Sequence, residues 1–517
     1  MPPKLKVLFV VSECWPLVKT GGLADVVPAL ARALMAQDCE VRILMPGYRQ
    51  VEEAFAGKAA SRPLAVLPGV DRVRLVRGRL PDYDIPMWLL SCPALFDRPG
   101  GPYADESGHD WWDNSVRFGV LGKVATLFAT GRGLDGWKAN VLHGHDWHAG
   151  LASAYAAFDP AVAAGTVFTI HNLAYQGNFH PGVRHFLGIE EQALRMDGLE
   201  FHGHLGFMKA GLWYSDRLTT VSPTYARQVQ TEEYGCGMSG VLRMRSGVLS
   251  GILNGVDGLI WNPETDALLP ARYTADDLDG KARCKLALQD RFGLARGPEI
   301  PILGMVGRMA SQKGWDLLAE ALPALLAEKI QCVLVGSGNH ELEAQLAHLA
   351  ARHPGVVGLH LGYDEPLSHL VMAGSDVFTV PSRFEPSGLT QMYSQRYGTP
   401  PVVRLTGGLA DSVVEATPAS IADGSGTGFF FELAEATALA EAVLGAVRLC
   451  REDHAMWRRL QANGMAQDFG WHKPAAAYRE VYERALVDSR VRRGLRQPAG
   501  KHPVKAADRP GRPGTRR

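Results

Sequence analysis

One stretch of the sequence decides the fold: KVLFVVSECWPLVKTGGLADVVPALARALMAQDCEVRILMP (residues 6–46). It contains two short apolar runs, at 6–12 and 40–46, on either side of a helical pattern at 23–37. Both runs are apolar throughout instead of alternating, which is typical of strands buried on both faces of a sheet. A strand, a helix and a second buried strand form a βαβ unit, so this stretch predicts a parallel sheet covered by helices.

The same alternation continues along the chain. Further strand-like runs occur in the first half at 85–91, 140–146, 165–172 and 217–222, and in the second half at 300–308, 329–338, 356–362, 376–382 and 400–408. The fold class is therefore α/β, with two doubly wound parallel-sheet domains. We expect domains over 1–255 and 256–470, a C-terminal helix over 471–490, and a basic disordered tail over 491–517.

The composition fits a globular protein and indicates the cellular compartment in which it is found. Basic and acidic residues number 54 each, but residues 490–517 hold ten of the basic ones and a single Asp, so an acidic body carries a basic tail. The seven cysteines form no C-x-x-C pair, and no apolar run is long enough to cross a membrane. The first strand begins at residue 6, which leaves no room for a signal peptide. We therefore expect a cytoplasmic protein without a metal, nucleic-acid or membrane partner; the sequence does not indicate an oligomeric state.

The hexapeptide TGGLAD occurs twice, at 20–25 and 406–411, each time between an expected strand and an expected helix. Ligands of open parallel sheets bind at the carboxyl ends of the strands, so two facing domains would place both copies on one cleft. The paired glycines, Gly21 and Gly22 in the first copy, let backbone N–H groups approach a ligand, and a helix N-terminus favours an anion. A tight turn before a helix explains the second copy equally well.

Three cations, Lys19, Arg308 and Lys313, fall in loops at strand ends. Together they would bind a phosphorylated ligand without a metal, although each one alone could be an ordinary surface charge. The most specific local motif is EPSGLT (385–390), which brings the carboxylate of Glu385 next to consecutive backbone N–H groups at a helix start. Such a set suits a nucleotide sugar; an ordinary helix cap after a turn is the alternative.

The segment HGHDWH (143–148) places three histidines and an Asp within six residues. Its spacing matches no common metal-ligand pattern, so recognition of sugar hydroxyls is favoured over a metal site. The D-x-D at 82–84 precedes a strand and is expected to be a solvated turn. Aromatic residues, which can stack on sugar rings, are frequent around the first-half motifs: Trp111, Trp112, Trp147, Tyr175, Trp213 and Tyr214.

Taken together, the motifs resemble those of the bacterial glycogen synthases, relatives of the plant starch synthases. They occur in that family's order and span nearly the whole chain: KTGGLADV, HGHDWHAGL, TIHNLAYQG, ILNGVD, GRMASQKGWD, EPSGLTQMYS and TGGLAD. The resemblance implies the GT-B fold, in which two Rossmann-like domains face each other across the active site and a C-terminal helix crosses back to the first domain. It also implies a retaining transfer of glucose from ADP-glucose to the non-reducing-end 4-hydroxyl of an α-1,4-glucan such as glycogen, without a metal or other cofactor.

The resemblance assigns catalytic roles to five residues. Arg308 and Lys313 would stabilise the departing diphosphate, and Glu385 would hold the donor glucose. His171 would face the anomeric carbon with its backbone carbonyl, and Asp146 would assist the acceptor hydroxyl.

The same resemblance implies a donor-binding set. Lys19 and Asp25 would lie at the donor, and Tyr363 would pack on the base. The other members are Gly21, Gly22, Asn254, Ser387, Gly388, Leu389 and Thr390. Two positions depart from the family pattern: Ser387 stands where Cys is common, and Tyr393 stands where many retaining relatives have a second Glu, so ribose contacts must come from elsewhere.

Three other functions stay open at this point. Another retaining GT-B transferase would use UDP-glucose or a small acceptor. A Rossmann oxidoreductase would carry G-x-G-x-x-G after the first strand, which residues 6–22 lack. A glucan-binding protein without activity would keep the aromatic residues but would not need the three cations and Glu385 together.

Overall fold

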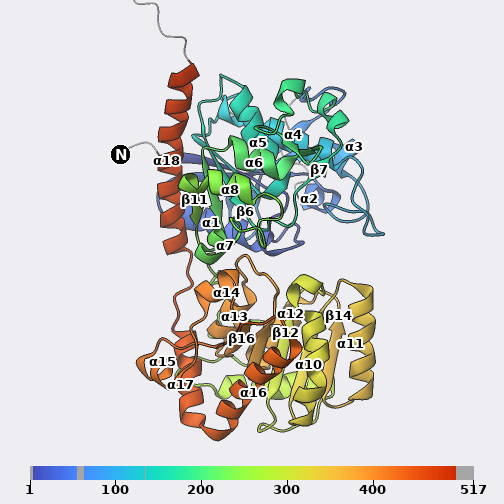
Figure 1. Cartoon of the computed structure of the whole chain (residues 1–517), viewed down its shortest axis with the longest axis vertical. Helices are drawn as coiled ribbons and strands as arrows, with labels where there is room; N and C mark the ends of the chain where they lie inside the picture. The colour runs from blue at the N-terminus through green and yellow to red at the C-terminus, as the bar shows by residue number, and fades with distance from the viewer. Residues whose placement is uncertain (1–3, 55–62, 134–135, 497–517) are drawn as a thin grey trace, which may run out of the picture.

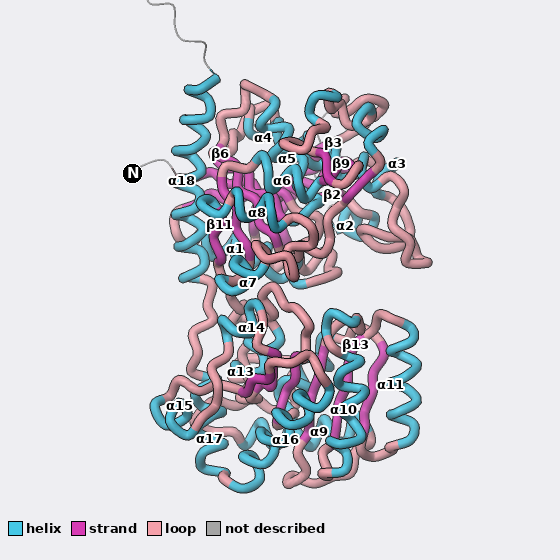
Figure 2. The backbone as a smooth tube through the Cα atoms, in the orientation of Figure 1, coloured by secondary structure: helices cyan, strands magenta, loops and turns pink. Residues whose placement is uncertain are grey.

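The computed structural model describes residues 4–54, 63–133 and 136–496. Figure 1 shows two α/β lobes, one for each half of the chain, with the last helix running alongside the first lobe. In Figure 2 the strands of both sheets lie between helices. We call the part with strands β1 to β11 the first lobe and the part with β12 to β17 the second lobe.

The first lobe is built on an eight-stranded sheet in the order β11-β10-β6-β5-β1-β2-β4-β3. Its strands are β1 (Leu5–Val10), β2 (Cys39–Pro46), β3 (Arg74–Leu80), β4 (Ile85–Ser91), β5 (Val141–His145), β6 (Gly165–Ile170), β10 (Arg217–Thr220) and β11 (Leu249–Gly251). The central strands β5 and β6 are buried at every residue, as their continuous apolar runs predicted. All neighbouring strands are parallel except β3, which pairs antiparallel with β4 at the edge.

The prediction of parallel-sheet domains is therefore confirmed, and nothing in the sequence indicated the antiparallel strand β3 at this edge. Along β3, Leu75 and Leu80 are buried and the three arginines Arg74, Arg77 and Arg79 are exposed, which suits a strand at the edge of a sheet. The helices of the lobe are α1 (Gly22–Met35), α2 (Arg49–Ala54), α3 (Pro93–Phe96), α4 (Asn114–Ala129), α5 (Asp146–Phe158), α6 (Phe207–Tyr214), α7 (Pro223–Gln228) and α8 (Ser239–Met244). A small antiparallel sheet adds β7 (Asn178–Phe179), β8 (Glu200–Phe201) and β9 (His204–Gly206).

The second lobe has a parallel six-stranded sheet in the order β14-β13-β12-β15-β16-β17. Its strands are β12 (Ile302–Val306), β13 (Gln331–Gly336), β14 (Val357–Leu361), β15 (Val377–Val380), β16 (Pro401–Arg404) and β17 (Phe429–Phe431). Its helices are α9 (Asp279–Phe292), α10 (Trp315–Ala327), α11 (His340–Arg352), α12 (Glu365–Gly374), α13 (Thr390–Arg396), α14 (Gly407–Ser412), α15 (Pro418–Asp423), α16 (Ala436–Glu452) and α17 (His454–Met465). Both edges of the central strand β12 are thus paired, and the carboxyl ends of the neighbouring parallel strands β12 and β15 lie on the same side of the sheet.

The last helix, α18 (His472–Arg496), packs on the first lobe although it follows the second lobe in sequence (Figure 1). Tyr478, Tyr482 and Ala485 are fully buried in the first-lobe core. A Cβ atom on Gly165 of β6 would lie 2.8 Å from the Ala485 carbonyl carbon, so helix and strand are in close contact. The helix continues to Arg496, past the expected end at 490. Residues 491–496, expected to belong to a disordered tail, are therefore helical. Arg492 contributes to this extension by pairing with Asp216 at 2.7 Å.

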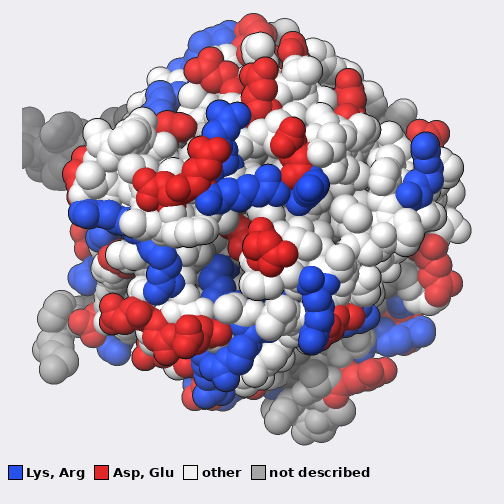
Figure 3. Space-filling model, turned by 90° about the horizontal axis from the view of Figure 1, so that it is seen from below, with Lys and Arg blue, Asp and Glu red and all other residues white. Residues whose placement is uncertain are grey.

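The rest of the predicted tail, 497–517, lies outside the described residues, and the domain limits at 255 and 470 stay predictions. Within the described part of the chain, none of the helices combines the length and the hydrophobicity that a membrane crossing requires. On the end of the second lobe that points away from the first, acidic and basic side chains are interspersed without a broad field of one sign (Figure 3).

Candidate active site

Glu385 and Lys313 form an ion pair at the carboxyl ends of the second-lobe strands. Glu385 follows β15, and Lys313 ends the short 3-10 helix η4 (Ser311–Lys313) that follows β12. The Lys313 Nζ lies 2.6 Å from Glu385 Oε2, and the Ser382 hydroxyl donates to the same oxygen at 2.9 Å. The Glu385 side chain is only 6% exposed, so these two donors stabilise a buried carboxylate.

The second TGGLAD copy lies directly against the Glu385 loop. A Cβ atom on Gly407 would lie 1.8 Å from the Glu385 carbonyl oxygen, and one on Gly408 would lie 2.2 Å from the Ser387 carbonyl oxygen. Gly407 also adopts a φ of +47°, which favours glycine. The glycine pair therefore lets two backbone segments pack together, as the turn interpretation of this copy allowed.

The Asp of that copy, Asp411, connects the lobes. It accepts two hydrogen bonds at 2.7 Å from the backbone N–H and the hydroxyl of Thr224, in the first turn of α7. The Ser222 hydroxyl, at the start of the same helix, donates to the Pro386 carbonyl at 2.6 Å. Helix α7 of the first lobe is thus held against the Glu385 loop of the second.

The first TGGLAD copy has different partners. Asp25 pairs with Lys19 at 2.9 Å, and the Lys19 Nζ also lies 5.4 Å from the ring centroid of Tyr363 in the second lobe. Burial acts to lower the pKa of Lys19, but the Asp25 carboxylate outweighs it and raises the pKa, so Lys19 is charged at neutral pH. A Cβ atom on Gly22 would lie 3.6 Å from the Leu389 side chain, and one on Gly21 would meet nothing within 4 Å. Both hexapeptides therefore lie against the 385–390 segment, and only the first one has open space beside it.

Asp146 and His171 form a second polar group, in the first lobe. Asp146 begins α5 with a φ of +56° and accepts hydrogen bonds from the backbone N–H of His171 at 2.8 Å and of Asn172 at 3.3 Å. Burial raises the pKa of Asp146 to about 7 against the opposing effect of these two donors. The His171 ring contacts His145 at 2.9 Å, and burial lowers the pKa of His171 to about 3. Asp146 is thus a carboxyl group that can change protonation near neutral pH beside a neutral imidazole.

The other expected residues also lie at this junction of the lobes. The exposed Arg308 crosses it, with its guanidinium carbon 5.5 Å from the Tyr175 ring centroid. Asn254 Oδ1 and Ser387 Oγ are buried and have no hydrogen-bond partner among the described residues. Gly388 has a φ of +67°, and Leu389 and Thr390 form the start of α13.

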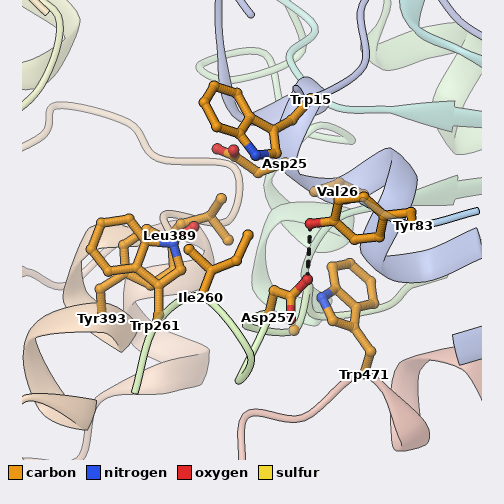
Figure 4. Close-up of a pocket in the computed structure, with 11 residues that line it drawn as sticks. Trp15, Asp25, Val26, Tyr83, Asp257, Ile260, Trp261, Leu389, Tyr393 and Trp471 are labelled. Atoms are coloured by element: carbon orange, nitrogen blue, oxygen red, sulfur yellow. Dashed lines mark hydrogen bonds between the residues drawn. The ribbon is translucent and has the colours of Figure 1, made fainter. Parts of the chain in front are cut away.

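A small pocket lined by Asp25 adjoins the Lys19–Asp25 pair. In Figure 4, Trp15, Asp25 and Tyr83 reach it from the first lobe, and Trp261, Leu389 and Tyr393 reach it from the second. The Tyr393 ring is stacked on Trp261, with the ring centroids 3.9 Å apart. Tyr393 is therefore part of an aromatic wall of the pocket.

Sequence reasoning missed two residues that organise the site. Glu13 is buried and accepts from the backbone N–H groups of Thr20 and Gly21, at 2.5 and 3.0 Å, and from the Tyr103 hydroxyl at 3.0 Å. The second missed residue is Ser382, whose hydroxyl donates to Glu385. The sequence did contain a sign of Glu13, a carboxylate that follows an apolar strand, but it contained no sign of Ser382.

Among the residues that the structure describes, no group of three or more His, Cys, Asp or Glu side chains is arranged to hold a metal ion. Two histidines of HGHDWH have side-chain partners instead: His143 contacts Tyr482 of α18 at 2.9 Å and Thr169 at 2.6 Å, and His145 contacts His171 at 2.9 Å.

Comparison with known proteins agrees with this arrangement. Residues 6–244 match the family model of the starch synthase catalytic domain, and residues 288–459 match that of glycosyl transferases group 1. The glycogen synthase of Thioalkalivibrio sulfidiphilus is 50% identical over 483 residues, which cover 93% of this chain and 99% of that protein. The chain belongs to the glycogen synthase family.

Other members and solved structures support the assignment. Glycogen synthase 1 of Methylococcus capsulatus is 47% identical over 93% of this chain and 97% of its own length. The catalytic domain of starch synthase IV from Arabidopsis thaliana, solved with ADP and acarbose, is 32% identical, with a TM-score of 0.83 over 94% of this chain and all of that one. The sucrose-phosphate synthase of Thermosynechococcus elongatus is 19% identical, with a TM-score of 0.56 over 94% of this chain and 99% of that one, and shows the shared fold alone. The GT-B fold is thereby confirmed, and the oxidoreductase alternative is excluded.

Proposed function

We propose that this chain, as a glycogen synthase, transfers glucose from ADP-glucose to the non-reducing-end 4-hydroxyl of an α-1,4-glucan, with retention of configuration. One observation carries the proposal: the Lys313–Glu385 pair of the second lobe and the Lys19–Asp25 pair of the first lobe both adjoin the 385–390 segment, in a chain of this family. Cations and a sugar-binding carboxylate are what a nucleotide-sugar donor needs.

The departing diphosphate determines which charge the site must stabilise. When the bond between the anomeric carbon and the phosphate oxygen breaks, its electron pair stays on the diphosphate. Arg308, Lys313 and Lys19 would stabilise that charge, and fixed donors of this kind are each worth about 3 kcal/mol in an enclosed site. Three fixed cations can supply the charge that a metal ion provides in other transferases, so we propose that the reaction proceeds without one.

The acceptor must lose a proton as its oxygen bonds to the anomeric carbon. Asp146, with its pKa raised to about 7, is suited to receive that proton because its ionised form is a stronger base than an ordinary carboxylate. Glu385 would hold hydroxyls of the donor glucose, and the His171 carbonyl would face the developing positive charge. Tyr363, which lies beside Lys19, would pack on the base. The remaining donor contacts would come from the loops of Gly21, Gly22 and Asn254 and from Ser387, Gly388, Leu389 and Thr390.

Label transfer tests the proposal directly. The purified protein is incubated with glycogen and radiolabelled ADP-glucose or UDP-glucose, without added metal, and label in the polymer is counted. We expect incorporation from ADP-glucose. Incorporation from UDP-glucose alone, or label found only in small sugars, would favour the alternative of a different retaining GT-B transferase. A cytoplasmic location and the absence of nucleic-acid and membrane partners stay predictions.

A further inference from the structure

The ion pair at the centre of the site joins two loops that are 72 residues apart in sequence. Lys313 has a long side chain with many rotamers, so its 2.6 Å contact with Glu385 depends on how firmly the two backbones are held together. The features that hold them are outside the donor-binding set.

The two loops are in direct backbone contact. The backbone N–H of Arg383 donates to the Gln312 carbonyl at 2.8 Å, and the Gln312 side chain donates to the Phe384 carbonyl at 3.2 Å. A Cβ atom on Gly314 would lie 2.0 Å from the Pro381 carbonyl oxygen, and Gly314 has a φ of +73°. Only glycine lets the turn of Lys313 approach the Glu385 loop this closely.

The Arg383 side chain holds that turn from both sides. Its two terminal nitrogens donate to the two carboxylate oxygens of Asp316, in the first turn of α10, at 2.7 and 2.8 Å. One of them also donates to the Ser311 carbonyl at 2.9 Å. Ser311 and Asp316 flank Lys313, so one planar guanidinium fixes the segment before and after it. In the same turn, the Trp315 indole donates to the Arg308 carbonyl at 2.9 Å, which ties Arg308 to the same helix start.

The ion pair between Arg383 and Asp316 is partly exposed, so its effect on the position of the Lys313 turn can be told apart from an effect on folding stability. The side chains of Arg383 and Asp316 are 34% and 39% exposed, and exposed ion pairs contribute little to folding stability. The Asp316 pKa is nevertheless lowered, because the hydrogen bonds and the charge of Arg383 outweigh the opposing effect of burial. No hydrogen bond or ion pair of the described residues joins the Arg383 or Asp316 side chain to Glu385 or Lys313.

We propose that Arg383 is a positioning residue for glucosyl transfer: with Asp316 it forms a brace that keeps the Lys313 turn against the Glu385 loop. This inference rests on the proposed function. Lys at position 383 would keep the charge but lose the two parallel hydrogen bonds, so the brace depends on the shape of the guanidinium.

The test compares R383K, D316N and the double variant with R296K. The control removes another bidentate pair of the same lobe, Arg296 with Asp290 at 2.6 and 2.5 Å, on its surface. We expect R383K and D316N each to lower kcat about tenfold or more, since small misplacements at a reacting centre are costly, while the KM for glycogen and the melting temperature stay near wild type. The double variant should be no slower than the slower single variant, because both remove one interaction. R296K should match the wild type.

Two results would overturn the brace. One is an R383K kcat close to that of R296K. The other is a crystal structure of R383K in which the Lys313–Glu385 distance is unchanged, whereas a lengthened distance supports the brace. A wild-type protein that transfers no glucose to glycogen would refute the proposed function instead, and the R383K structure would still decide the brace.

Discussion

Replacing Lys313 by Met tests the charge that would stabilise the leaving diphosphate. The Lys313 Nζ lies 2.6 Å from Glu385, whose side chain is 6% exposed, and Met keeps the length of the side chain without its charge. A fixed donor aimed at developing negative charge is worth about 3–4 kcal/mol, so we expect K313M to lower kcat by roughly 10² to 10³. The free energy of unfolding should fall by only about 1.5–3 kcal/mol, the value of a charged hydrogen bond, because Ser382 still donates to Glu385.

The chain offers a matched control in the same lobe. Lys285 pairs with Asp376 at 2.8 Å, and their side chains are 10% and 18% exposed. K285M therefore removes an ion pair of similar burial that is no part of the donor site. We expect it to lower the free energy of unfolding at least as much as K313M does, and to leave kcat near wild type.

Initial rates of label incorporation at saturating ADP-glucose give kcat, and urea titration gives the free energy of unfolding. Two outcomes would contradict the reasoning. If K313M kept more than about a tenth of the wild-type kcat, its charge would not stabilise the transition state. If K285M were as slow as K313M, the rate loss would reflect a weakened lobe instead of a lost charge.

Three further predictions follow from the same contacts. Since only ionised Asp146 can accept a proton and its pKa is raised to about 7, wild-type kcat/KM should rise with pH to a plateau above that value; a pH–rate profile of D146N should lack this rise. D411A removes both acceptors for Thr224 at the start of α7, so urea titration should show a loss of about 1–2 kcal/mol, with the ADP affinity measured by calorimetry unchanged. Excess chelator should leave the rate of label incorporation unaltered, and a rate that collapsed and recovered with Mg²⁺ would contradict the role given to the three cations.

The parallel strands could be predicted because burial on both faces demands continuous apolar runs. The run at 165–172 became β6, whose residues Gly165–Ile170 are all buried. The edge strand β3 escaped prediction because RLVRGRL is half polar and takes its strand conformation from pairing with β4. The helical residues 491–496 escaped for a similar reason, since the partner of Arg492 in this segment is Asp216, which is far away in sequence.

The candidate site, like the fold, could be predicted from the sequence only in part. The motifs containing Lys19, Lys313 and Glu385 are local, and the ends of parallel strands bring such loops to one side of a sheet. The two copies of TGGLAD, however, are identical in sequence but differ in their neighbours and in the backbone conformation of their first glycine, which is extended at Gly21 and left-handed at Gly407. Glu13 binds the first copy, and the carbonyl oxygen of Glu385 lies against the second, which sequence spacing alone does not reveal.

The path of α18 has a consequence for synthesis of the chain on the ribosome. The first lobe includes Tyr478, Tyr482 and Ala485 in its core, more than two hundred residues after its last strand, β11. While the second lobe is being translated, the nascent first lobe therefore lacks the helix that packs on β6 at Gly165. The first-lobe core is complete, and glucosyl transfer is possible, only after α18 has been synthesised. A chain that ends before this helix should bind chaperones and should have no transferase activity.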